Sequence, residues 1–98
     1  MERITDIKQL KPGDKIWSID HFSANATIIE FVCIHPHNPE YSVFLNINYD
    51  GMPKFYNKRL QEDKWYRYDG TDACWNEIHD AEIVEHQKWI EHLRGRLK

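Results

Sequence analysis

The fold is decided by a strand-forming run, Ile28-Ile29-Glu30-Phe31-Val32-Cys33-Ile34, which lies within residues 25–35. Its side chains are mostly β-branched or aromatic, a composition typical of a strand that is covered on both faces or that belongs to a curled sheet. Pro36 and Pro39 follow it. Because proline has no N–H to donate to a ladder, the strand must give way to a loop there. Residues 25–35 are therefore predicted to form one long strand.

Four shorter segments around this run also alternate in the manner of strands, with side chains pointing to opposite faces in turn. In the first of them, Trp17 and Ile19 share one face while Ser18 and Asp20 share the other. The segments are residues 14–21, 41–47, 54–56 and 65–68. Five strands in succession, joined by short connections, predict an antiparallel sheet or a small barrel.

The hydrophobic period changes near Asp80. Ile83, Ile90 and Leu97 recur every seven residues, which predicts an amphipathic helix over residues 80–97 with one apolar stripe. Asp80 suits the N-cap position, and the order of acidic residues first and basic residues last complements the helix dipole. Residues 71–79 fit either an early helical turn or a final strand.

We expect the apolar stripe of this helix to pack on the protein's own sheet. The alternative is weak pairing with a second copy of the chain. Only about two and a half heptads are available and His86 interrupts them, which is too little for a stable coiled coil. The sequence therefore predicts a monomer or a weak homodimer.

Five strands followed by one helix predict an α+β domain. The segment Leu10-Lys11-Pro12-Gly13-Asp14-Lys15-Ile16-Trp17, followed by four short strands, resembles the opening of SH3-like small barrels, in which a Pro-Gly-Asp turn feeds the first strand. The resemblance implies a five-stranded antiparallel barrel capped by the C-terminal helix. It also implies a binding module for peptides, RNA or other proteins, although the fold alone fixes no function.

The length and charge of the chain narrow its functional class. Ninety-eight residues suffice for one domain, which we expect to hold the sheet or barrel over about residues 10–79 and the helix over about 80–97. The net charge of −3 does not favour general affinity for nucleic acid. The N-terminus lacks the apolar run of a secretory signal, and no run approaches the length of a membrane span. These features predict a cytoplasmic protein with no membrane contact.

Residues 54–68 form the most distinctive stretch for binding, since five aromatic rings alternate there with five basic side chains and two acidic ones. Such a mixture suits a protein contact, where Trp, Tyr and Arg are frequent, and also suits single-stranded nucleic acid. It also fits strands whose rings serve only the core. We expect a protein partner, with single-stranded nucleic acid as the alternative, and a contact set of Lys54, Tyr56, Lys58, Arg59, Trp65 and Arg67.

A metal site has weaker support. Cys33, His35 and His37 could share one side of a strand end, but Pro36 interrupts the geometry and no second ligand pair is marked by spacing. The competing interpretation is a buried cysteine followed by exposed loop histidines. No motif of a hydrolase, metalloprotease or phosphate-binding loop is present. We therefore expect a non-enzymatic protein with no cofactor, although a small enzyme or metal protein whose site is invisible in sequence remains the third class.

Overall fold

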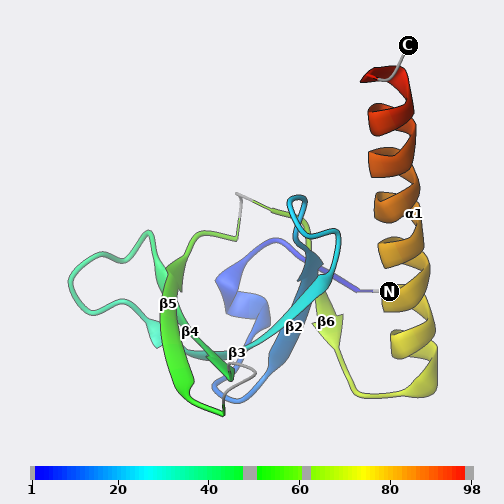
Figure 1. Ribbon diagram of the computed structural model, residues 1–98. Helices are drawn as coiled ribbons and strands as arrows, with labels where there is room; N and C mark the ends of the chain where they lie inside the picture. Colours follow the sequence, from blue (N-terminus) through cyan, green and yellow to red (C-terminus); the bar gives the residue numbers. More distant parts are fainter. Residues whose placement is uncertain (1, 48–50, 61–62, 97–98) are drawn as a thin grey trace.

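The computed structural model describes residues 2–47, 51–60 and 63–96 and, over that range, shows one six-stranded antiparallel sheet and one C-terminal helix (Figure 1). The strands lie side by side in the order β1-β6-β2-β3-β4-β5. A short 3-10 turn, η1 (Ile7–Gln9), follows the first strand. The elements are β1 (Arg3–Ile4), β2 (Lys15–Ile19), β3 (Ala26–Ile34), β4 (Ser42–Ile47), β5 (Pro53–Lys58), β6 (Trp65–Tyr68) and α1 (Asp72–Arg96). The predicted α+β class is confirmed.

The sixth strand comes from the N-terminal lead-in. Ile4 in β1 pairs with Trp65 in β6, and its side chain is buried. The chain then turns through η1, where the Asp6 carboxylate accepts from the Lys8 N–H and the Gln9 side chain accepts from the Asp6 N–H. The Asp6 side chain also accepts from the Gln9 N–H, so Asp6 and Gln9 form a capping box.

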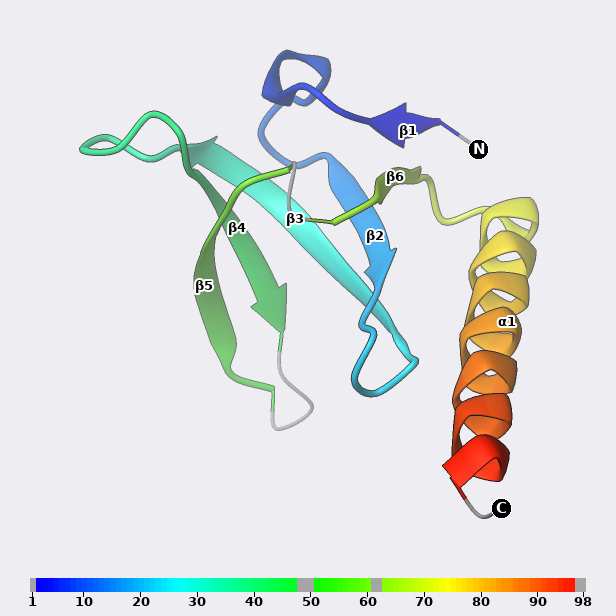
Figure 2. The same cartoon turned by 90° about the horizontal axis from the view of Figure 1, so that it is seen from above.

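The sheet is open, with β1 and β5 at its two edges, and it is strongly curled (Figure 2). A register shift between Phe31 and Cys33 marks a bulge in β3, the kind of irregularity that bends a strand. The concave side encloses the larger core, in which the rings of Phe31 and Phe44 meet edge to face. This core contains Ile4, Leu10, Ile16, Ile29, Phe31, Phe44, Leu60 and Trp65.

A second, smaller core lies on the other face of the sheet, under the first turns of α1. Trp17 of β2 is buried there with Cys74 and Ile78 of the helix. Its neighbours along the strand, Ile16 and Ser18, are also buried and face the larger core. β2 is therefore covered on both faces and contributes side chains to both cores.

The helix begins eight residues earlier than predicted, at Asp72 instead of Asp80. The Thr71 hydroxyl accepts a hydrogen bond from the Cys74 N–H, and the Asp69 carboxylate accepts from both the N–H and the hydroxyl of Thr71. These bonds from Thr71 lower the pKa of Asp69. The prediction that Asp80 is the N-cap is therefore wrong, and residues 72–79 form the early helical turns, not a strand.

The aromatic side chains of β4 and β5 differ in how deeply they are buried. Phe44 is fully buried, whereas Phe55 is 66% exposed. Phe44→Ala should lower the free energy of unfolding by about 3–5 kcal/mol, because it leaves a cavity in the larger core. Phe55→Ala should change it by less than about 0.5 kcal/mol. Urea denaturation of both variants measures this, and equal losses would contradict the placement of the core.

Candidate functional site

Residues 54–68, the stretch of aromatic and basic side chains, fall into three groups in the structure: side chains in the core, side chains that stabilise the fold by polar contacts, and exposed side chains. The ring of Trp65 belongs to the core and is only 2% exposed. It is buried because β6 lies between β1 and β2 and turns this side chain toward the concave side. Trp65 was expected in the contact set, but its ring is not available to a partner.

The side chain of Arg67 in β6 makes hydrogen bonds within the protein. Its Nε donates to Oε2 of Glu2 at 2.8 Å, its Nη1 donates to Oδ2 of Asp14 at 3.1 Å, and its Nη2 donates to the carbonyl of Gln9 at 2.7 Å. One guanidinium therefore ties β6 to the lead-in and to the turn before β2. Three charge-assisted bonds of this kind make Arg67 a structural residue.

These contacts shift two pKa values. The bond to Glu2 is the main cause of the raised pKa of Arg67, with Asp14 adding to it. The pKa of Asp14 is lowered, first by the N–H of Lys11, which donates to its carboxylate at 2.9 Å, and then by Arg67. Asp14 is therefore held as a carboxylate within the turn that leads into β2.

Arg59 contacts the loop that precedes β4 through two side chains. Its Nη2 lies 2.8 Å from Oε2 of Glu40, and its guanidinium carbon lies 4.6 Å from the centroid of the Tyr41 ring. The side chain is 41% exposed, so one part of it still faces solvent. It fixes the loop before β4 against the end of β5.

The remaining residues of the predicted contact set lie on β5. Tyr56 stands opposite Phe44 of β4 and is half-buried. The ammonium of Lys58 lies 5.8 Å from the centroid of the Tyr56 ring, within reach of a cation–π contact. Lys54 is exposed at the other end of the strand. Lys54, Tyr56 and Lys58 alternate along one side of β5, and Phe55 and Asn57 along the other.

We call the outer side of this strand the β5 edge; it comprises residues 53–58. Because β5 is the last strand of the sheet, it has a strand partner, β4, on one side only within the described residues. The N–H and C=O groups of its other side are therefore open to a new partner. Neither Lys54 nor Lys58 forms an ion pair within the described ranges, and residues 54–59 contain three bases and no acid.

The metal candidates do not converge on one point. Nδ1 of His35 accepts from the N–H groups of His37 and Asn38, both at 3.1 Å, so this nitrogen is used to shape the loop. Cys33 is exposed, contrary to the expectation of a buried cysteine, because the end of β3 runs past the larger core. Within the described residues, no group of three or more potential ligands is placed to hold a metal ion.

The structure also reveals an exposed surface that sequence reasoning assigned to the core. Helix α1 contacts the sheet through Cys74, Ile78 and Ala81. The heptad side chains Ile83 and Ile90 are about half exposed instead. The expectation that this stripe packs on the protein's own sheet is wrong, because the turns that start at Asp72 provide a different face for that contact.

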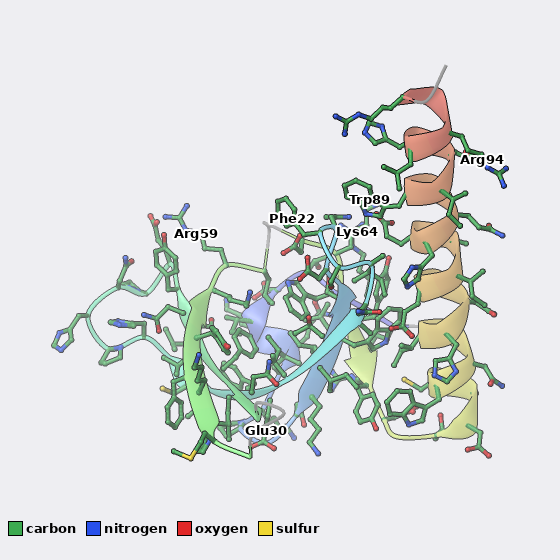
Figure 3. The ribbon with its side chains drawn as sticks, in the orientation of Figure 1. Phe22, Glu30, Arg59, Lys64, Trp89 and Arg94 are labelled. Atoms are coloured by element: carbon green, nitrogen blue, oxygen red, sulfur yellow. The ribbon has the colours of Figure 1, made fainter. Side chains whose placement is uncertain are left out.

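Beyond those turns, the β2–β3 loop holds the helix by polar contacts. Oε2 of Glu82 accepts from the Ala26 N–H at 2.9 Å. Nδ1 of His21 lies 3.2 Å from Oε1 of Glu85, and Nε1 of Trp89 donates to the His21 carbonyl at 2.7 Å. Figure 3 shows Trp89 beside this loop, whose tip carries Phe22.

A groove of about 750 Å³ runs between α1 and the strands β2 and β6. Its apolar lining comes from Trp17, Ile19, Tyr66, Ala81 and Val84, and most of its other lining side chains are charged, with both signs present. Nε1 of Trp17 is buried without a hydrogen-bond acceptor among the described residues. Its polar lining includes His21 and Glu85, whose Nδ1 and Oε1 atoms lie 3.2 Å apart.

Comparisons of the chain with protein-family models, curated proteins and solved structures give no significant match. No helix within residues 2–47, 51–60 and 63–96 combines the length and apolar character needed to cross a bilayer.

The lowered pKa of Asp14 predicts a specific pH dependence. A carboxyl group whose pKa is lower in the folded state than its ordinary value of 3.8 stabilises the fold above that value and loses this contribution as the pH falls through the folded pKa. Asp14→Asn should therefore be less stable than the wild type at pH 7, and the difference should shrink as the pH falls below about 4. Urea denaturation across a pH series tests this, and a constant difference at all pH values would contradict it.

Proposed function

We propose that this protein is a non-enzymatic binding module that takes up an extended segment of a partner protein along the β5 edge. The observation that carries the proposal is the open edge itself, which combines unpaired backbone groups with a ring 66% exposed at Phe55. An extended segment can add to such an edge as a further strand, where backbone hydrogen bonds supply affinity and alternate side chains supply specificity.

The charges of the edge indicate the chemistry of the partner segment. Lys54 and Lys58 lie on the same side of the strand, about 14 Å apart at 3.4 Å per residue. Acidic side chains at alternate positions of an added strand can approach both of them. Phe55 on the opposite side offers an apolar contact, next to Leu45 across the ladder. The favoured ligand is therefore a segment in which acidic and apolar residues alternate.

Nucleic acid suits this surface less well. Single strands bind by stacking successive bases on exposed rings. Of the five rings in residues 54–68, Phe55 is exposed, Trp65 is buried and the three tyrosines are half-buried. One exposed ring offers no platform for successive bases, so the stretch favours a peptide over a single strand of nucleic acid.

We further propose that the sheet is related to SH3-like barrels. Support comes from the opening turn, in which Gly13 has a φ of 96° and donates to the Phe31 carbonyl at 2.9 Å. The chain then enters β2, and the last strand, β6, returns to pair with it. A cytoplasmic location is consistent with the free thiol of Cys33, which is exposed, since thiols stay reduced in that compartment.

Charge reversal on the strand tests the proposed function. The double variant Lys54→Glu/Lys58→Glu should weaken binding of a peptide of alternating Glu and Val at least tenfold, because both attractive contacts become repulsive. The matched control Lys8→Glu/Lys64→Glu carries the same change of charge at exposed positions outside β5 and should bind as the wild type does. Fluorescence anisotropy of a labelled peptide measures both affinities.

Two companion probes complete the experiment. A peptide of alternating Lys and Val should bind the wild type more weakly than the Glu peptide, and an oligothymidine should not be retained at low salt. Equal loss in the two double variants would overturn the assignment to the β5 edge. If the oligothymidine is retained at low salt and released steeply as the salt concentration rises, the partner is nucleic acid and not a protein.

A further inference from the structure

The second half of α1 carries a row of half-exposed side chains with no partner in the described part of the chain. Ile83, Ile90 and Leu93 are 54%, 48% and 51% exposed, and His86 is exposed between them. Their spacing of three and four residues is that of a heptad seam. We call these four residues the helix seam; Leu97, which continues the pattern in sequence, lies outside the described residues.

The helix seam is separate from the face that holds the sheet. At 100° per residue, its residues lie about 60–140° around the helix from Ile78, which is fully buried in the smaller core. A helix of 25 residues is about 37 Å long, and Figures 1 and 2 show its C-terminal half standing clear of the sheet. A second helix can therefore reach the seam without displacing the existing contact.

An antiparallel second copy matches the seam layer by layer. When the two helices are related by a two-fold axis at residue 88, Ile83 lies opposite Leu93 of the second copy, and His86 lies opposite Ile90 of the second copy. The two-fold axis generates the same two contacts again, with the roles of the two copies exchanged. Every aliphatic side chain of the seam then packs against the second copy, and the two histidines lie apart from each other.

The charges beside the seam select the antiparallel arrangement. In that register Asp80 and Arg94 of the second copy lie on one flank of the seam, and Glu82 and Arg96 of the second copy lie on the other, each pair within two residues of direct opposition. A parallel pair would instead bring the acidic start of one helix beside the acidic start of the other, which is destabilising. Neither Asp80 nor Arg94 forms an ion pair within the described residues, so both are available for this contact.

The β2–β3 loop lies close to the same axis. The hydrogen bond from Trp89 to the His21 carbonyl holds the loop beside the residue next to the axis. Phe22 at the loop tip is 92% exposed, and Figure 3 shows it near Trp89. The loops of two copies therefore approach each other at the centre of the pair, where Phe22 adds apolar surface.

We propose that two copies of this chain associate through the helix seams of α1 in antiparallel orientation, with the axis at residue 88. The partner of this surface is a second copy because one register satisfies both the apolar layers and the flanking charges. The proposal is independent of the function proposed for the β5 edge, which lies at the far end of the sheet.

Sedimentation equilibrium over a range of protein concentrations tests the association. The wild type should show a reversible monomer–dimer equilibrium. Ile90→Glu should weaken dimerisation at least tenfold, because it places a charge in an apolar layer. Val84→Glu is the matched control, since Val84 is 50% exposed but lies outside the seam, and it should dimerise as the wild type does. His86→Leu should tighten the dimer.

Charge exchange tests the orientation. Asp80→Arg and Arg94→Asp should each weaken the homodimer, because each creates two like-charged pairs. An equimolar mixture of the two variants should recover wild-type dimerisation, since both pairs become complementary between the different chains. Circular dichroism verifies that each variant is folded. A wild type that stays monomeric at every concentration overturns the proposal, and so does a mixture that shows no recovery.

Discussion

The structure depends on the contact between Trp17 of β2 and the first turns of α1. Trp17 is 1% exposed and belongs to one packed cluster with Cys74 and Ile78. This contact covers the second face of β2, whose other face already contributes Ile16 to the larger core. A small domain buries only a limited apolar area when it folds. A strand that is covered on both faces therefore gives this sheet much of its stability.

The same contact determines which parts of the helix are exposed. The first turns of α1 pack against Trp17. Hydrogen bonds of Glu82, Glu85 and Trp89 with the β2–β3 loop fix the direction of the remaining turns of the helix. The heptad residues are therefore turned away from the sheet. An exposed apolar row of this kind marks an interaction surface more often than it marks a defect of packing.

Much of the fold was predictable from the sequence, because alternation in β2, β4 and β6 and the β-branched composition of β3 are each typical of strands. The start of α1 was missed because Cys74 and Ile78 are separated by four residues, a spacing that fits a short helical turn and also an alternating strand. The cap at Thr71 is the local signal that decides between them. Burial was harder to predict, since alternation does not say which side of β6 faces inward. Pairing with β1 buries Trp65, and the contacts of Arg67 arise between segments far apart in sequence.

The two proposed surfaces complement each other. A pair of copies joined through α1 carries two β5 edges, so a partner with two suitable segments would bind the pair more tightly than a single copy. The placement of the helix seam depends on the anchoring of α1 by Trp17. A double-mutant cycle with Trp17→Phe and Ile78→Ala measures that anchor directly. The two changes should be coupled by about 1 kcal/mol in the free energy of unfolding, whereas Trp17→Phe with Ile90→Ala should be additive. Additive effects for Trp17 and Ile78 would contradict the packing on which the helix seam depends.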